Sequence, residues 1–120
     1  MNYNLVENDT TKYIEIVSSD VPLRSEQDAL DIISLSWEHD INMLLIHGYV
    51  LSEDFFDLKT GVAGKMLQKF INYNIKVGAI IPSQIADTGR FREMVLEANK
   101  GNAFRVFTGR EEAENWLLSI

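Results

Sequence analysis

The residues of this chain whose types and spacing suit chemistry gather in one stretch near the middle of the sequence. They are His47, Glu53, Asp54, Asp57, and Thr60 followed by Gly61. Histidine exchanges protons near neutral pH, carboxylates bind hard cations, and a hydroxyl at a helix start lies where a phosphate group is stabilised. This stretch is therefore the first candidate for a functional region.

His47 directly follows the apolar run 42–46, which is typical of a strand at the centre of a sheet. This position makes it the best candidate for a general base, because sites in α/β sheets form where strands end. No serine nucleophile stands beside it in a known pattern, and His39 is not at a spacing typical of a shared metal ion. The favoured interpretation is a structural histidine that bonds the loop backbone.

The acidic residues Glu53, Asp54 and Asp57 follow the same strand. Such a cluster suits a magnesium ion, as in the phospho-aspartate pocket of receiver domains. That pocket also requires a lysine at the end of the last strand, whereas Thr108 follows Phe107 here. A solvated acidic loop, with Asp57 as the cap of the next helix, is the favoured interpretation.

Thr60 and Gly61 come at the expected start of a helix with a regular apolar stripe. A phosphate on Thr60 would be stabilised by the backbone N–H groups and the dipole of that helix. The simpler interpretation is a hydroxyl that bonds the local backbone. Gly64 follows shortly after Gly61, and we expect both glycines to serve close packing at a crowded helix start.

Composition narrows the classes of function. The 120 residues carry a net charge of −7 with 46% hydrophobic residues, so we expect one folded domain over residues 1–120. An acidic surface disfavours binding to nucleic acids and to anionic membranes. Cysteine is absent and the two histidines are poorly spaced, so we expect no metal and no cofactor. The N-terminus lacks the pattern of a signal peptide, which predicts a cytoplasmic protein.

The hydrophobic pattern predicts helices and strands in alternation after an N-terminal β-hairpin. Strands are expected over 3–7, 12–17, 42–46, 76–81 and 103–107, with helices beginning near Ser25, Asp57, Asp87 or Thr88, and Thr108. The order β-β-α-β-α-β-α-β-α implies an α/β fold with a mixed sheet, because helical crossovers join parallel strands. The runs 43–46 and 77–81 are apolar throughout, so we expect two central strands buried on both faces.

Residues at the helix ends predict how the helices begin and stop. Capping boxes are predicted for Ser25 with Asp28 and for Thr108 with Glu111. Gly101 is expected in the left-handed conformation that ends a helix. The buried face of the last helix is predicted to consist of Ala113, Trp116, Leu117 and Ile120.

The segment FFDLKTGVAGKMLQKFINY, residues 55–73, resembles the bacterial family DUF4180, a domain of unknown function. The similarity continues through Glu97-Ala98-Asn99 to the closing segment 113–117, and so covers nearly the whole chain. The resemblance implies a compact, stand-alone bacterial protein, and the family brings no activity with it.

The order of elements is also similar to the sulphate transporter and anti-sigma-factor antagonist (STAS) fold. In that family a serine or threonine in an Asp-Ser-Ser-Gly-like turn after the third strand accepts a phosphate from an anti-sigma kinase. The resemblance makes Thr60, in the segment 57–61, the counterpart of the phosphorylated residue. Two residues separate Asp57 from Thr60, so the motif match is incomplete, and a likeness of fold constrains function weakly.

These observations leave two functions open. The leading hypothesis is a non-enzymatic interaction or regulatory module that contacts another protein, or a second copy of itself, through residues 47–64. The alternative is a small-molecule-binding domain or weak enzyme that uses a crevice near His47, Asp57 and Ser83. A flat surface favours the first hypothesis, and a pocket with converging polar groups favours the second.

Overall fold

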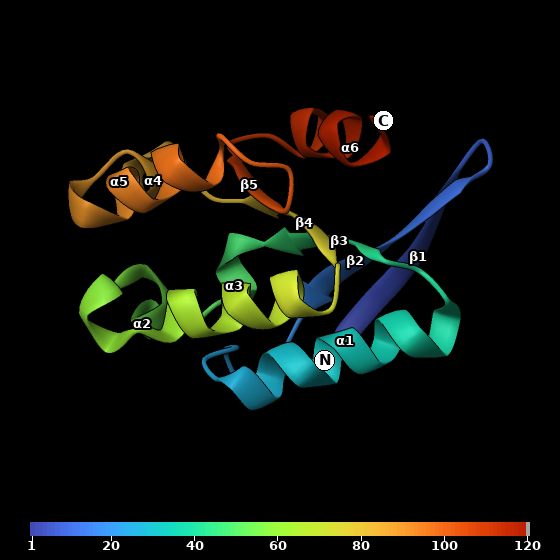
Figure 1. The fold of residues 1–120 in the computed structure, drawn as a ribbon, viewed down its shortest axis with the longest axis horizontal. Helices are drawn as coiled ribbons and strands as arrows, with labels where there is room; N and C mark the ends of the chain where they lie inside the picture. The colour runs from blue at the N-terminus through green and yellow to red at the C-terminus, as the bar shows by residue number, and fades with distance from the viewer. Residues whose placement is uncertain (120) are drawn as a thin grey trace.

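The computed structural model describes residues 1–119, which form a five-stranded sheet flanked by helices (Figure 1). The strands lie in the order of the chain: β1 (Asn2–Asn8), β2 (Thr11–Ser18), β3 (Met43–His47), β4 (Lys76–Ile80) and β5 (Phe104–Phe107). β1 pairs antiparallel with β2, and all later pairs are parallel. The predicted α/β fold with a mixed sheet and an N-terminal hairpin is therefore confirmed.

Long helices and short helical turns connect the strands. The long helices are α1 (Glu26–His39), α3 (Val62–Asn72), α5 (Gly89–Ala98) and α6 (Arg110–Leu118). The short turns, which the sequence does not predict, are η1 (Gly48–Val50), α2 (Glu53–Phe56), η2 (Leu58–Thr60) and α4 (Ser83–Ala86). Within the described chain, none of these helices is long and apolar enough to cross a bilayer.

The two faces of the sheet are covered unequally. α1, α3 and α5 cover one face, and α6 covers the other (Figure 1). Side chains alternate along β3, so Leu44 and Ile46 belong to the first layer while Leu45 packs with α6. Residues 44–46 and 77–79 are all buried. The prediction that these two strands are central and buried on both faces is confirmed.

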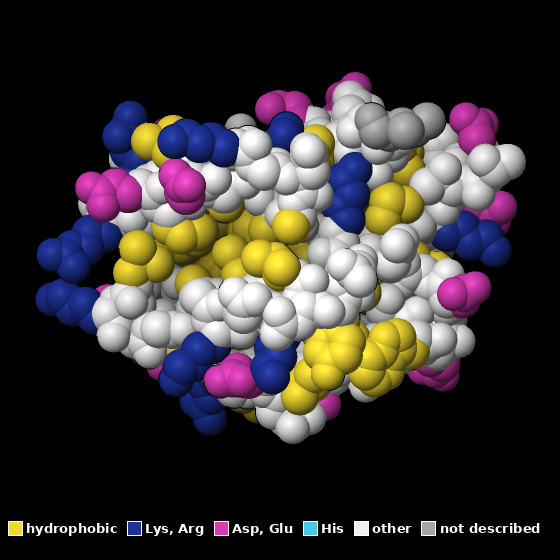
Figure 2. All heavy atoms as spheres, in the orientation of Figure 1, with side chains coloured by type: hydrophobic (Ala, Val, Ile, Leu, Met, Phe, Trp, Pro, Cys, Tyr) yellow, Lys and Arg dark blue, Asp and Glu magenta, His cyan; other side chains and the backbone are white. Residues whose placement is uncertain are grey.

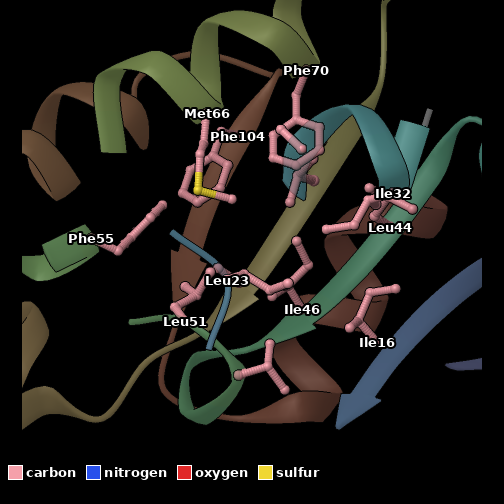
Figure 3. Close-up of a cluster of buried hydrophobic side chains, with 14 of the residues drawn as sticks. Ile16, Leu23, Ile32, Leu44, Ile46, Leu51, Phe55, Met66, Phe70 and Phe104 are labelled. Atoms are coloured by element: carbon pink, nitrogen blue, oxygen red, sulfur yellow. The ribbon is translucent and has the colours of Figure 1, made fainter. Parts of the chain in front are cut away.

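The larger apolar layer also anchors the connection that follows β3. Figure 3 shows Leu23 and Leu51 among the buried side chains contributed by the sheet, α1 and α3. The backbone N–H of Leu23 donates to the Val50 carbonyl at 2.8 Å, and the N–H of Ser52 donates to the Leu23 carbonyl at 2.9 Å. The segment that leaves β3 is therefore held in place by the segment that precedes α1.

α6 packs against the sheet over Gly78 of β4, where a Cβ would make an ordinary van der Waals contact. A Cβ on Gly78 would lie 3.5 Å from Leu117. At the start of β4, Nζ of Lys76 donates to two carbonyl oxygens in the last turn of α6, at 2.9 and 3.1 Å. Ile120 lies outside the described residues, and the rest of the predicted buried face of α6 is confirmed, namely Ala113, Trp116 and Leu117.

The two predicted capping boxes have different outcomes. The Ser25 hydroxyl accepts a hydrogen bond from the Asp28 N–H at 3.1 Å, as predicted, while the Asp28 carboxylate bonds the N–H of the residue before Ser25. The box of Thr108 with Glu111 is wrong. α6 begins after Gly109, one residue later than the pattern predicts, and no side chain caps it.

Two predictions about glycines are also wrong. Among residues 1–119 the glycines with positive φ are Gly61, at 75°, and Gly89, at 59°, so Gly101 is not in the left-handed conformation. A Cβ on Gly64 would meet nothing within 4 Å. The start of α3 is therefore open at Gly64 rather than crowded, and Gly61 is required for its backbone conformation.

The two edges of the sheet differ. On β5, the N–H of Val106 donates to the side-chain oxygen of Asn99 at 2.8 Å, and the Asn99 amide donates to the Val106 carbonyl at 3.3 Å. Asn99 thus occupies the place that a neighbouring strand would take. No comparable side-chain block covers the outer edge of β1 in the part of the chain that the structure describes, and Leu5 of that strand is exposed.

Apolar side chains reach the surface at two places outside the sheet edges. Figure 2 shows them lining a hollow between α3 and α5. The second place is the exposed pair Trp37 and Tyr73, whose rings meet edge to face with centroids 5.3 Å apart. Neither place lies at the ends of the parallel strands, where sites of α/β sheets form.

Candidate functional site

A pocket opens where the parallel strands β3, β4 and β5 end. We call it the edge pocket; its lining includes His47, Ile80 and Thr108 at the strand ends, Glu53 and Phe56 of α2, and Ser83, Gln84 and Ile85 of α4. Its volume is about 690 Å³, which is within the range of roughly 300–1,000 Å³ found for small-molecule sites. The edge pocket therefore has the place and the size of a ligand site.

The tight turn after β3 determines one wall of the edge pocket. A Cβ on Gly48 would lie 2.8 Å from the carbonyl oxygen of Ile80 on the neighbouring strand, so only glycine fits. The turn η1 therefore runs directly against β4 and places Tyr49 beside His47. The two rings are stacked, with centroids 5.1 Å apart and planes 23° apart, and Tyr49 is 70% exposed.

The part of the lining that Phe56 contributes is apolar and rests on packed aromatic rings. Phe56 is partly buried, and its ring meets that of Phe91 edge to face at 5.3 Å. Phe55 lies beneath it and is 1% exposed. Because these rings already pack against one another, the wall is formed before any ligand arrives.

Behind His47 lies a polar cluster, the Glu15 cluster, made of Glu15, His47, Arg110, Tyr13 and Glu114. Glu15 is only 7% exposed, and its Oε2 lies 2.6 Å from Nε2 of His47 and 3.1 Å from Nε of Arg110. Its Oε1 accepts from Nη2 of Arg110 at 2.8 Å. The same nitrogen donates to the Tyr13 hydroxyl at 2.9 Å, and this hydroxyl donates to Glu114. The cluster thus joins β2, β3 and α6.

The contacts of His47 differ from the prediction. Within the described residues its ring bonds the Glu15 carboxylate rather than the loop backbone, so that part of the prediction is wrong. The reason is that β2 and β3 are parallel neighbours, with Glu15 opposite Leu45 and therefore on the same face as His47. A buried carboxylate is a stronger acceptor than a loop carbonyl.

Arg110 determines the charge state of the Glu15 cluster. Its hydrogen bonds hold the pKa of Glu15 below the usual range, although burial acts in the opposite direction. The same hydrogen bonds raise the pKa of Arg110. Burial, and then the hydrogen bond to Glu114, raises the pKa of Tyr13 to about 12. At neutral pH the cluster therefore holds an ionised Glu15, a charged Arg110 and a neutral Tyr13.

Sequence reasoning missed Glu15, Arg110 and Tyr13. The alternation of residues around Glu15 fits an ordinary strand with one polar face. Arg110 and Glu15 are 95 residues apart, so no local spacing connects them. The available signal is the position of Glu15 between Ile14 and Ile16, because a strand inside a sheet covered on both faces rarely carries an unpaired charge.

Only some of the residues predicted as a site lie together in the structure. His47 and Glu53 line the edge pocket, and so does Ser83. Asp57 lies instead at a separate cleft, where its carboxylate accepts from the N–H of Lys59 at 3.1 Å. Asp57 therefore caps η2, and the prediction that it caps the following long helix is wrong because η2 intervenes.

Thr60 is engaged within its own turn. Its hydroxyl lies 2.6 Å from the carbonyl oxygen of Asp54 and 2.8 Å from that of Asp57, and it accepts from the N–H of Val62 at 3.2 Å. Gly61 follows in the left-handed conformation and precedes α3. Asp54, Thr60 and Gly61 do not line the edge pocket. The hydroxyl of Thr60 thus fixes the turn before α3.

The donors around the edge pocket suit an organic ligand. Its polar lining consists of imidazole, hydroxyl, amide and a single carboxylate, on otherwise apolar walls. Among residues 1–119, no three histidine, aspartate or glutamate side chains lie close enough together to hold a metal ion. The arrangement can therefore offer hydrogen bonds and an apolar surface to the same molecule.

Comparison with known proteins gives a family without an activity. The family model described as Domain of unknown function (DUF4180) matches residues 8–117. No curated protein and no solved structure matches the chain. The likeness to the STAS fold therefore has no support from a neighbour.

Proposed function

We infer that this chain, which belongs to the Domain of unknown function (DUF4180) family, binds a small molecule in the edge pocket. The observation that carries the proposal is a hollow of about 690 Å³ at the carboxyl ends of three parallel strands. Organic ligands bind in such hollows, whereas protein partners mostly bind flatter surfaces. The alternative function considered from the sequence is therefore the one that the geometry favours.

The walls indicate the kind of molecule. Most of the lining is apolar, so the ligand needs an apolar body that covers Phe56 and Ile85. The exposed ring of Tyr49, stacked on His47, offers a flat face on which an aromatic or heteroaromatic ring can stack. Glu53 at the rim and the net charge of −7 disfavour polyanions. We therefore propose a planar ligand that is neutral or cationic.

Protein interaction through residues 47–64 is the second proposal. It is supported by Tyr49, 70% exposed, and by the exposed carboxylates of Glu53 and Asp54 on the same segment. Its phosphorylation version, which follows the STAS resemblance, has less support because the hydroxyl of Thr60 makes local hydrogen bonds. A regulatory protein can also use both features, with a ligand in the pocket and a partner at its rim.

A fluorescence titration tests the first proposal. The probe is N-phenylnaphthylamine, an uncharged aromatic dye that fluoresces when it enters an apolar site. Ser83→Trp places a large ring in the edge pocket, and Ser34→Trp makes the same change at an exposed serine of α1. We expect saturable binding by the wild type and by Ser34→Trp, and an affinity at least about tenfold lower for Ser83→Trp, which corresponds to about 1.4 kcal/mol.

Two outcomes contradict the proposal. One is the absence of saturable binding by the wild type, both of the dye and of a library of neutral and cationic aromatic fragments observed by NMR. The other is unchanged dye affinity in a Ser83→Trp variant whose circular dichroism and melting match the wild type. The second outcome would show that the dye binds elsewhere, for example at the hollow between α3 and α5.

A further inference from the structure

We propose that the edge pocket selects ligands that carry an N–H or O–H donor, and that Nδ1 of His47 accepts this hydrogen bond. The inference rests on the proposed ligand-binding function and adds the chemical class of the ligand: an aromatic compound with a phenol-like hydroxyl or a ring or amide N–H. It follows from the geometry of the Glu15 cluster, which determines on which nitrogen of His47 the proton lies.

Glu15 can only accept hydrogen bonds. Both of its oxygens are bound by Arg110, through Nε at 3.1 Å and Nη2 at 2.8 Å, which is the two-point contact of a guanidinium with an ionised carboxylate. A protonated carboxyl group in this place would direct its hydrogen at a donor. Glu15 is therefore an anion, and an anion offers lone pairs only.

The position of the proton on His47 follows. Nε2 lies 2.6 Å from Oε2 of Glu15, so it must be the donor in this hydrogen bond. A neutral imidazole has one N–H, and when it is on Nε2 the other nitrogen, Nδ1, carries a lone pair. Glu15 thus acts as a positioning residue, in the way that a carboxylate orients a histidine that binds through its other nitrogen.

Nδ1 is the polar atom that the ring has left for a ligand. The ring of His47 makes no hydrogen bond besides that to Glu15 within residues 1–119, and it lines the edge pocket. Tyr49 stacks on the face of the ring, which leaves the ring edge for hydrogen bonding. The neighbouring Ser83 and Gln84 can both donate and accept, so they do not discriminate between ligands. The carboxylate of Glu53 also only accepts, but it is exposed to water, whereas the His47 side chain is 17% exposed, so His47 is the more sheltered acceptor of the pocket.

Two probes of nearly the same shape test the proposal. Naphthol carries an O–H donor, and its methyl ether, methoxynaphthalene, can only accept. We expect the wild type at neutral pH to bind naphthol about three- to tenfold more tightly, the effect of one net hydrogen bond. In His47→Phe this preference should vanish while the methyl ether still binds, because the apolar walls remain. Isothermal titration calorimetry gives both affinities.

A measurement on the wild type keeps the proposal testable if the variant folds poorly. The nitrogen chemical shifts of the His47 ring, from two-bond proton–nitrogen NMR spectra, report which nitrogen is protonated. We expect the N–H on Nε2. N–H groups on both nitrogens, the N–H on Nδ1 alone, or equal affinity of the wild type for the two probes overturns the inference and leaves the ligand-binding function standing. Failure of both probes and of the dye to bind overturns the proposed function together with it.

Discussion

The carboxylate of Glu15 is buried in the sheet, and the side chains of Arg110 and His47 compensate the cost of burying it. The side chain of Glu15 is 9% exposed, with Arg110 on one side and His47 on the other. A buried ion pair adds little stability compared with a well-packed apolar pair, but removing one partner leaves a costly unpaired charge. Arg110 is therefore the residue whose loss should affect folding most directly, since it is the permanent cation of the cluster.

Arg110→Met removes the guanidinium and keeps most of the apolar stem. We expect the free energy of unfolding to fall by about 2 kcal/mol, less than for a fully buried pair because the Arg110 side chain is 44% exposed. Arg92→Met, on the exposed side of α5, is the matched control and should change it by less than about 0.5 kcal/mol. Urea denaturation measures both. Equal free energies of unfolding for the two variants would mean that the buried charge of Glu15 does not need Arg110 to compensate it.

The lowered pKa of Glu15 also links folding to pH. On acidification the unfolded chain takes up the proton first, because its glutamate has the higher pKa. The contribution of Glu15 is therefore complete above the usual pKa of 4.5 and is lost as the pH falls below that value. We expect the stability difference between wild type and Glu15→Gln to be constant between about pH 7 and pH 5 and to shrink below about pH 4.5. A difference that persists unchanged to about pH 3 contradicts this.

Among the helices and strands, the long ones could be predicted because each buries one side of a regular repeat. In α3 the buried residues Ala63, Met66 and Phe70 follow the helical period, and β3 is apolar from Met43 to Ile46. The short elements η1, α2 and η2 have three or four residues and hence no period. Their positions are determined by contacts far along the chain, such as the backbone pairing of Leu23 with Val50.

The start of α3 offers a test of how this element is built. Gly64 lies in the first turn, where an added Cβ meets nothing within 4 Å. Gly64→Ala should therefore raise the free energy of unfolding by about 0.5–1 kcal/mol, because alanine restricts the unfolded chain and favours the helix. Gly61→Ala should lower it by about 1–2 kcal/mol, since φ at this position is 75°. Thermal melting shows whether each variant is more or less stable than the wild type. Destabilisation by Gly64→Ala would mean that the position is crowded after all.

For the molecule as a whole, the unequal covering of the sheet determines where the site forms. α6 covers the second face and begins with Arg110, so Glu15 and His47 lie at the margin of the helix, next to the open strand ends. His47, Glu53 and Ser83 could be predicted as site residues because His47 is the last residue of a strand, and Glu53 and Ser83 lie in the connections that leave the carboxyl ends of strands. Glu15 and Arg110 could not, because only the packing of α6 on the sheet brings them together.

The amide of Asn99 has a consequence for the symmetry of any assembly built through the sheet. Unlimited growth would require the edge of β1 in one copy to join the edge of β5 in the next, and Asn99 already occupies the backbone groups of Val106 on β5. β1 is therefore the better edge for pairing, and two copies that meet β1 to β1, around a two-fold axis, use both of these edges at once. The side chain of Asn99 thus favours closed pairs over fibres in any such association.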